Sequence, residues 1–138
     1  MMTRSCLPVG LLIACLLGSC TTPTRRHMRE ADALLFQSEE KMAAGDLAQA
    51  LALAEQTGLA VKAGVVARPV RKGAGGEPLD MTPLLEAWSN GPHRELLSAL
   101  RERQTEPAVS AFAATRQQCT NCHVAVGRVD IPISALLR

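Results

Sequence analysis

The sequence has very few aromatic residues: no tyrosine, two phenylalanines and one tryptophan among its 138 residues. Because aromatic rings supply much of the volume of a protein core, such a chain builds a thin core unless something else fills it. It also lacks an excess of charge, with a formal net charge of +2, and its Lys and Arg residues are scattered. This balance excludes a nucleic-acid-binding protein that works by neutralising phosphates.

Long apolar runs are also scarce. Only one, at the extreme N-terminus, approaches the length of a membrane span, which excludes a multi-pass membrane protein. A chain of 138 residues that is 47% hydrophobic and 20% charged is typical of one globular domain.

The N-terminal run is typical of a secretion signal. Arg4 provides a positive charge, an apolar stretch covers residues 7–17, and Leu17-Gly18-Ser19-Cys20 ends it with small residues. These four residues resemble the lipobox of bacterial lipoproteins, whose cysteine is acylated on its thiol and becomes the first residue of the mature chain. We therefore predict a lipoprotein signal peptide at 1–19, lipidation of Cys20 and a periplasmic protein anchored in a membrane through its lipid.

Two features of this signal leave alternatives. Cys15 fits the same pattern loosely, but cutting there would leave an apolar segment at the lower limit of length, so Cys20 is preferred. A plain signal peptide or an uncleaved anchor is the other interpretation. In lipoproteins an Asp after the cysteine tends to hold the protein at the inner membrane, and Thr21 stands there, so the resemblance favours the outer membrane.

The cysteines of the mature chain then form a single pair. Cleavage before Cys20 removes Cys6 and Cys15, and the lipid occupies the thiol of Cys20. Only Cys119 and Cys122 remain for other chemistry, which excludes a disulfide framework between distant segments.

These two cysteines belong to Cys119-Thr120-Asn121-Cys122-His123, the C-x-x-C-H attachment signature of a c-type haem. On a helix, the three side chains stand at i, i+3 and i+4 and share one face. Two thiols one turn apart can reach the two vinyl groups of a porphyrin, and the adjacent imidazole then lies under the iron. We expect one covalent haem c, held by Cys119 and Cys122, with His123 as proximal ligand of the iron.

Two other uses of a closely spaced cysteine pair are a structural zinc site and a redox-active disulfide. A structural zinc site normally needs four ligands, and the mature chain adds only His27 and His93 without a second closely spaced pair. A thioredoxin-like redox pair needs a preceding strand, and none is predicted before Cys119.

The remaining chain has helical periodicity. Residues 25–44 form a helix whose apolar stripe includes Met28, Leu35 and Met42, Gly45 ends it, and Asp46 caps a helix over 47–59. We expect a loop at 61–80, a third helix from 81 or 82 that breaks at residues 90–92 and resumes, and a fourth from 106 that ends near Gly127. The expected face of the fourth helix carries Ala108, Phe112, Thr115, Cys119 and His123.

Four helices with the haem near the C-terminal end of the last one form an all-α up-and-down bundle. The predicted organisation is a tether at 20–26 and a helical cytochrome domain at 27–138. A haem is a large flat apolar body, so it can supply the core volume that the missing rings do not. Trp88 is expected in the core or against the haem, His93 is expected to face solvent, and Lys62, Arg68, Arg71 and Lys72 form a basic cluster on the loop.

The chain resembles the class II c-type cytochromes, the four-helix group that includes cytochrome c prime, whose C-x-x-C-H lies near the C-terminus. Residues 27–30, 41–47, 122–128 and 131–133 are similar to small periplasmic cytochromes with a Met on the first helix. Members often carry a His three residues after that Met, and this chain has Ala31 there. The resemblance makes Met28 the candidate sixth ligand, while His27, Met42, Met81 and His93 stay open.

The expected function is single-electron transfer to a redox partner protein. No catalytic constellation is found, so we expect neither an enzyme nor a substrate other than a gas. If Leu35 faces the iron instead of a ligand, the haem would be five-coordinate and suited to binding a small gas. A haem-free structural lipoprotein is the third interpretation.

Overall fold

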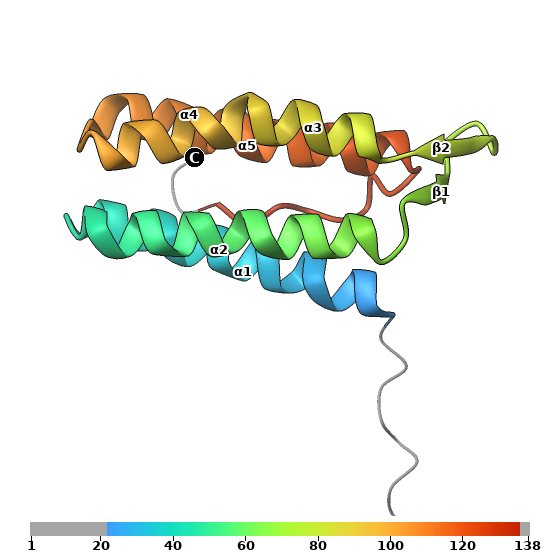
Figure 1. Ribbon diagram of the computed structural model, residues 1–138, viewed down its shortest axis with the longest axis horizontal. Helices are drawn as coiled ribbons and strands as arrows, with labels where there is room; N and C mark the ends of the chain where they lie inside the picture. The colour runs from blue at the N-terminus through green and yellow to red at the C-terminus, as the bar shows by residue number, and fades with distance from the viewer. Residues whose placement is uncertain (1–21, 136–138) are drawn as a thin grey trace, which may run out of the picture.

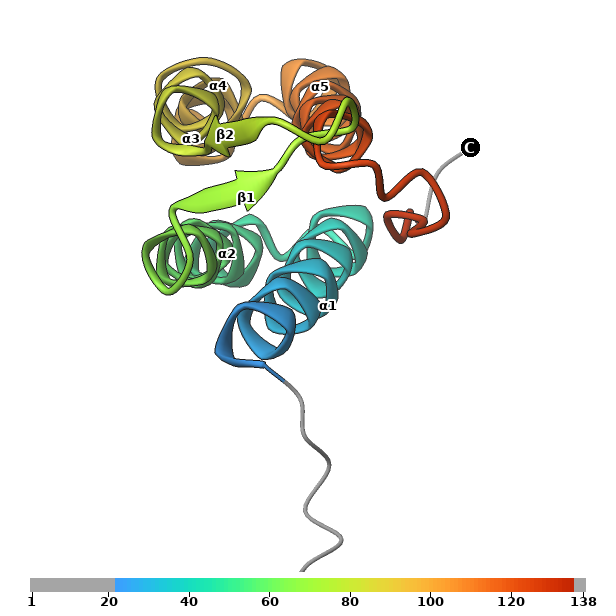
Figure 2. The same cartoon turned by 90° about the vertical axis from the view of Figure 1, so that its right-hand side faces the viewer.

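The computed structural model of the chain describes residues 22–135; the expected signal peptide and Cys20 lie outside this range. The described elements, in chain order, are α1 (Pro23–Ala43), α2 (Leu47–Val66), β1 (Val70–Lys72), β2 (Pro78–Asp80), α3 (Thr82–Asn90), α4 (Pro92–Arg101) and α5 (Thr105–Ala125). The helices dominate, so the predicted all-α class is confirmed. Because α3 and α4 lie end to end, the five helices form four rods (Figure 1, Figure 2).

The first two helices form the predicted αα-hairpin. Gly45 takes the left-handed conformation, with φ of +82°, that a side chain with a Cβ rarely adopts. The next helix is capped by Asp46, whose Oδ1 accepts a hydrogen bond of 3.1 Å from the backbone N–H of Gln49. The first helix begins at Pro23, so the last four residues of the segment 20–26 are helical.

The expectation of a loop over residues 61–80 is wrong in two places. First, α2 continues through Gly64 to Val66. A Cβ at Gly64 would lie only 2.7 Å from Cε of Met28, so this glycine gives α1 room instead of ending the helix. Second, β1 and β2 form an antiparallel hairpin in which Val70 pairs with Asp80. Strands of three residues are too short to show a clear alternation in sequence.

The later helices end and begin at the glycine and proline residues that the sequence suggested. The break between α3 and α4 falls at Gly91, and Pro92 opens α4 where its missing N–H does no harm. The last helix, α5, ends before Gly127, whose φ is +68°, and the N–H of Arg128 bonds to the carbonyl of His123 at 2.7 Å. Both predictions are confirmed.

The continuous hydrophobic core lies at one end of the bundle, where α1 turns into α2 and α4 turns into α5. Phe112 is fully buried in it, and its other buried members come from α1, α2, α4 and α5: Leu35, Met42, Ala50, Ala54, Leu96, Ala99, Leu100, Ala108 and Ala111. The opposite end carries the β hairpin, the start of α1 and the end of α5 (Figure 1). None of the described helices is long and apolar enough to cross a membrane.

Candidate functional site

The C-x-x-C-H motif occupies the last two turns of α5, at the end of the bundle outside the core. Cys119, Cys122 and His123 are all helical and half-buried. On the preceding turns of this helix, Phe112 and Thr115 are fully buried. The expected face of α5 is therefore buried in the core at Phe112 and Thr115 and only half-buried at the motif. A group held beside the helix could reach the thiols and the imidazole there.

The two thiols are in a setting that keeps them protonated. Burial, followed by the neighbouring Cys122, raises the pKa of Cys119 to about 12, and Asp32 adds to the rise. Burial also raises the pKa of Cys122. A reactive redox or nucleophilic cysteine needs the opposite shift, because the thiolate is the reacting species. This environment does not favour the thioredoxin-like use of the pair.

The three motif side chains are spaced along one face of α5 and do not meet at a single point. Within residues 22–135, no group of three or more His, Cys, Asp or Glu side chains is arranged to hold a metal ion. Cys119, Cys122 and His123 therefore do not converge on one point, as ligands of a bare ion do. Haem attachment needs a different geometry, because the thiols bond to the porphyrin edge and only the imidazole meets the metal.

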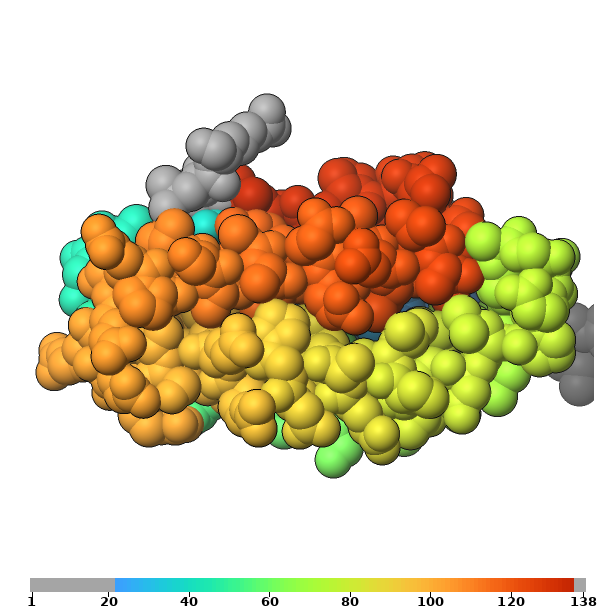
Figure 3. Space-filling view, turned by 90° about the horizontal axis from the view of Figure 1, so that it is seen from above, coloured from blue at the N-terminus to red at the C-terminus, as the bar shows by residue number. Residues whose placement is uncertain are grey.

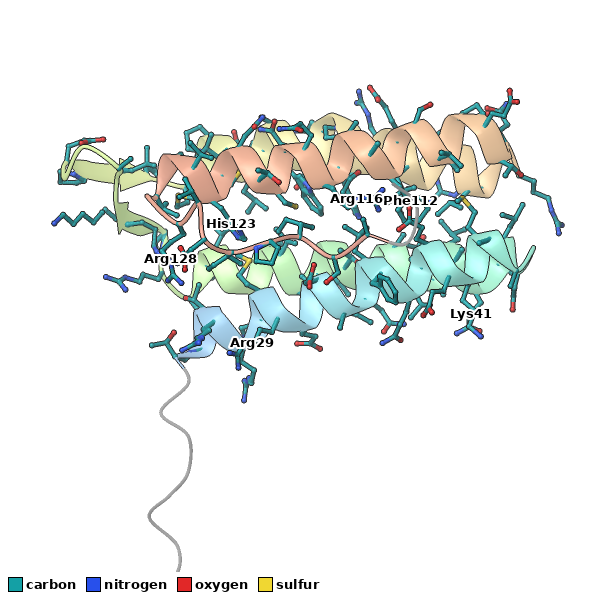
Figure 4. The ribbon with its side chains drawn as sticks, turned by 180° about the vertical axis from the view of Figure 1, so that it is seen from behind. Arg29, Lys41, Phe112, Arg116, His123 and Arg128 are labelled. Atoms are coloured by element: carbon teal, nitrogen blue, oxygen red, sulfur yellow. The ribbon has the colours of Figure 1, made fainter. Side chains whose placement is uncertain are left out.

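The side chain of His123 lies between its own helix, α5, and the segment that follows this helix (Figure 4). Its Nδ1 is 3.5 Å from the carbonyl oxygen of Ile131. A carbonyl can only accept, so this long hydrogen bond places the proton on Nδ1 and leaves the lone pair of Nε2 available. A metal-bound histidine commonly has this arrangement, in which the second nitrogen donates to a backbone carbonyl.

A buried aromatic pair backs the motif. The ring of Trp88 stacks on the ring of His93, with centroids 4.3 Å apart and planes inclined by 16°. The indole N–H of Trp88 has no well-formed hydrogen bond, and the sulfur of Cys119 is close enough for the indole to lower the thiol pKa slightly. Trp88 is buried, which confirms the expectation of a core position, and it lies beside Cys119.

The expectation that His93 faces solvent is wrong. Its side chain is buried, and Nε2 donates a 2.9 Å hydrogen bond to the carbonyl of Ala54. Two features of its surroundings explain this position: Trp88 covers one face of the ring, and Gly58 leaves space at its edge. A sequence pattern does not show such a pocket, because its parts come from α2, α3 and α4.

Met28, the candidate sixth ligand, lies near the start of α1. Figure 1 shows that α1 begins at the end of the bundle where α5 ends. Met28 is half-buried and its methyl group packs at Gly64 of α2. Among the other residues that stayed open, His27 contacts Glu30 at 3.6 Å, Met42 is in the distant core and Met81 is buried before α3.

The basic cluster expected on a loop lies on α2 and the hairpin. Lys62 belongs to α2, Arg71 and Lys72 to β1, and Arg68 to the connection between them. Burial lowers the pKa of Arg71, and the positive charges of Arg68 and Arg128 lower it further. Arg71 therefore lies close to two further positive charges, those of Arg68 and Arg128.

Apolar surface is also exposed at this end. Figure 3 shows a narrow opening between α3 and the C-terminal half of α5, through which blue atoms of α1 are visible. Large hydrophobic side chains remain exposed around the ends of α2 and α5, namely Val66, Val70, Val124, Val129 and Ile131. Two shallow hollows elsewhere, lined by residues such as Leu51 and Pro107, contain none of the motif residues. The motif end therefore differs from the opposite end in its exposed apolar side chains, whereas the two hollows lie near the turns that join α1 to α2 and α4 to α5.

No family model, curated protein or solved structure matches this chain.

Proposed function

We propose that the chain is a monohaem c-type cytochrome of the periplasm, anchored by a lipid on Cys20, that carries single electrons. The observation that carries the proposal is the placement of C-x-x-C-H on α5 at the end where the hydrophobic core stops. There the sequence keeps three chemically suited side chains half-exposed beside apolar surface. A covalently bound haem would supply the redox centre and the missing core volume together.

Each motif side chain has a separate role in this proposal. The thiols of Cys119 and Cys122 would form thioethers with the two vinyl groups and keep the haem in place through changes of oxidation state. His123 would bind iron through Nε2 while Nδ1 donates to Ile131. Trp88 would exclude water from the Cys119 side of the group, since it is buried there. Burial and the axial ligand are the two means by which such a chain sets the reduction potential.

Met28 is proposed as the sixth ligand. Its support is its place on α1 at the motif end and its position opposite Gly64, where a larger residue would displace the thioether. A thioether ligand raises the reduction potential relative to a second imidazole. Met42 makes a matched control, because it is buried in the core at the other end of the bundle.

Visible spectroscopy of the full chain, matured in cells that attach c-type haem, tests the function. We expect a c-type spectrum that survives acidic extraction of free haem and disappears in Cys119→Ala/Cys122→Ala. With Met28 as ligand, the wild type stays low-spin in carbon monoxide, Met28→Ala becomes high-spin and binds the gas, and Met42→Leu behaves as wild type. High-spin wild-type iron that binds the gas would favour the gas-binding function, and no haem band would leave the haem-free lipoprotein.

The anchor is tested separately, because Cys20 lies outside the described residues. We expect labelled palmitate to enter the wild-type chain and the Cys15→Ser variant but not Cys20→Ser. Fractionation of the two membranes then tests the proposed outer-membrane location. Label in Cys20→Ser and its loss in Cys15→Ser would move the anchor to Cys15.

A further inference from the structure

The segment that follows α5, residues 128–135, runs back across the bundle to α1, and we name it the C-terminal strap (Figure 4). Its start is fixed by the turn at Gly127 and by the hydrogen bond of 2.7 Å between the N–H of Arg128 and the carbonyl of His123. The guanidinium of Arg128 then pairs with Asp130, with Nε and Oδ1 3.1 Å apart. The strap is therefore a structured connection between the motif and the first helix.

The far end of the strap is attached to α1 by one residue pair. Ser134 donates its backbone N–H to Oδ1 of Asp32 at 2.8 Å and its hydroxyl to Oδ2 at 2.7 Å. Each carboxyl oxygen of Asp32 thus accepts one hydrogen bond from Ser134, one from the backbone and one from the side chain. This Asp32–Ser134 latch joins positions that are 102 residues apart in the chain.

Between its two ends, the strap presents a carbonyl to the motif. The carbonyl oxygen of Ile131 faces Nδ1 of His123 at 3.5 Å. Pro132 follows Ile131, and a residue before proline is restricted to extended backbone, which limits the directions that this carbonyl can take. The distance from the carbonyl to His123 therefore depends on where the strap is held, and the latch holds it.

Asp32 is also on the side of α1 that faces the motif helix. Burial is the main cause of the raised pKa of the Cys119 thiol, and the carboxylate of Asp32 adds to it. Asp32 stands one helical turn after Met28, so the latch residue and the candidate ligand share a face of α1. The latch therefore lies on the middle of α1, between Met28 and the core residue Leu35.

We propose that Asp32 and Ser134 are positioning residues for His123, holding the strap so that the carbonyl of Ile131 orients the imidazole and strengthens its donation to the haem iron. This inference rests on the proposed function. A hydrogen bond from the second nitrogen makes a ligating imidazole more basic and stabilises the oxidised iron. Release of the latch should therefore raise the reduction potential.

The test uses Ser134→Pro in the full haem-loaded chain, because proline removes both donors and leaves the charge of Asp32 in place. We expect an upward shift of the reduction potential. In the Met28→Ala background, which is expected to bind carbon monoxide, we also expect Ser134→Pro to lower the iron–histidine stretching frequency of the photolysed ferrous protein. Ser134→Ala, which keeps the backbone bond, should give a smaller shift in the same direction. Ser98→Ala is the matched control, because it removes an exposed hydroxyl bond of 2.8 Å to Glu102 at the other end and should change neither value.

A second measurement tests whether the strap is attached, and it does not depend on the iron. Trypsin cleavage after Arg128, followed by mass spectrometry, should be faster in Ser134→Pro than in the wild type. Faster cleavage with an unchanged potential would overturn the positioning role, and unchanged cleavage would overturn the latch. If the wild-type chain shows no haem band in its visible spectrum, neither variant can be compared. That result would overturn the proposed function together with this inference.

Discussion

Glu39 of α1 and Arg116 of α5 form a buried ion pair, with Oε2 and Nη1 2.9 Å apart and side chains only 1% and 12% exposed. Arg116 lies one turn before Cys119, so the pair stands where the well-packed core gives way to the motif (Figure 4). Ion pairs this deeply buried do not always add stability compared with apolar residues, but losing one partner is costly. The pair therefore fixes the relative placement of the first and last helices.

Removal of Arg116 should be strongly destabilising. In Arg116→Leu the carboxylate of Glu39 loses its guanidinium partner in a buried place, at a cost of about 3 kcal/mol in the free energy of unfolding. Arg101→Leu is the control, because its pair with Glu55 is 3.4 Å long and more than half exposed on both sides, which limits its cost to about 1 kcal/mol. Urea unfolding of both variants measures the difference, and equal midpoints would contradict the prediction.

The sole tryptophan provides an optical test of the site. Trp88 is 2% exposed and lies near Cys119, so a haem attached there would quench its fluorescence by energy transfer. We expect weak emission from the loaded chain, strong emission after unfolding, and strong emission from folded Cys119→Ala/Cys122→Ala. Bright emission from a loaded, folded chain would place the haem far from this wall.

His93 should make the protein less stable as the pH falls. Burial lowers its pKa below the ordinary value, although the bond to Ala54 and the charge of Glu55 act in the opposite direction. The unfolded chain then binds a proton near pH 6.5 while the folded chain stays neutral, so the stability that is full at pH 7 is progressively lost below about pH 6.5. Thermal melts from pH 7 to 5 should show a shallower loss in His93→Phe; parallel curves would refute this origin.

Two glycines of α2 should respond differently to alanine. At Gly58 a Cβ would lie 2.6 Å from Cε1 of His93, a ring held by its stack on Trp88, so Gly58→Ala should cost about 1–3 kcal/mol. At Gly64 the obstacle is the flexible end of Met28, and the gain in helix propensity of about 1 kcal/mol offsets its displacement. We therefore expect a lower melting temperature for Gly58→Ala only. A reversed order would show that the ring moves more easily than the thioether.

The helices could be read from the sequence because their ends carry strong local signals. Gly45, Asp46, Gly91 and Gly127 act through backbone conformation and capping, which depend on neighbours in the chain. The motif on α5 could be predicted for the same reason, since its spacing matches one turn of a helix.

Features made by distant residues could not be predicted. The Asp32–Ser134 latch joins two ordinary polar residues, and nothing near either of them indicates the other. His93 follows a Gly-Pro turn, a pattern that is typical of exposed residues, and only the packing of three helices buries it. Gly64 suggested a loop because the side chain that it accommodates, Met28, is on another helix.

The start of α1 at Pro23 limits where the proposed cytochrome can work. With a lipid on Cys20, only Thr21 and Thr22 separate the anchor from the first helical residue, and two extended residues reach about 7 Å. The first residues of α1 lie at the motif end of the bundle (Figure 1). Such a protein would exchange electrons in the plane of its membrane, meeting partners by lateral diffusion, and a soluble carrier would have to approach that surface to reach it.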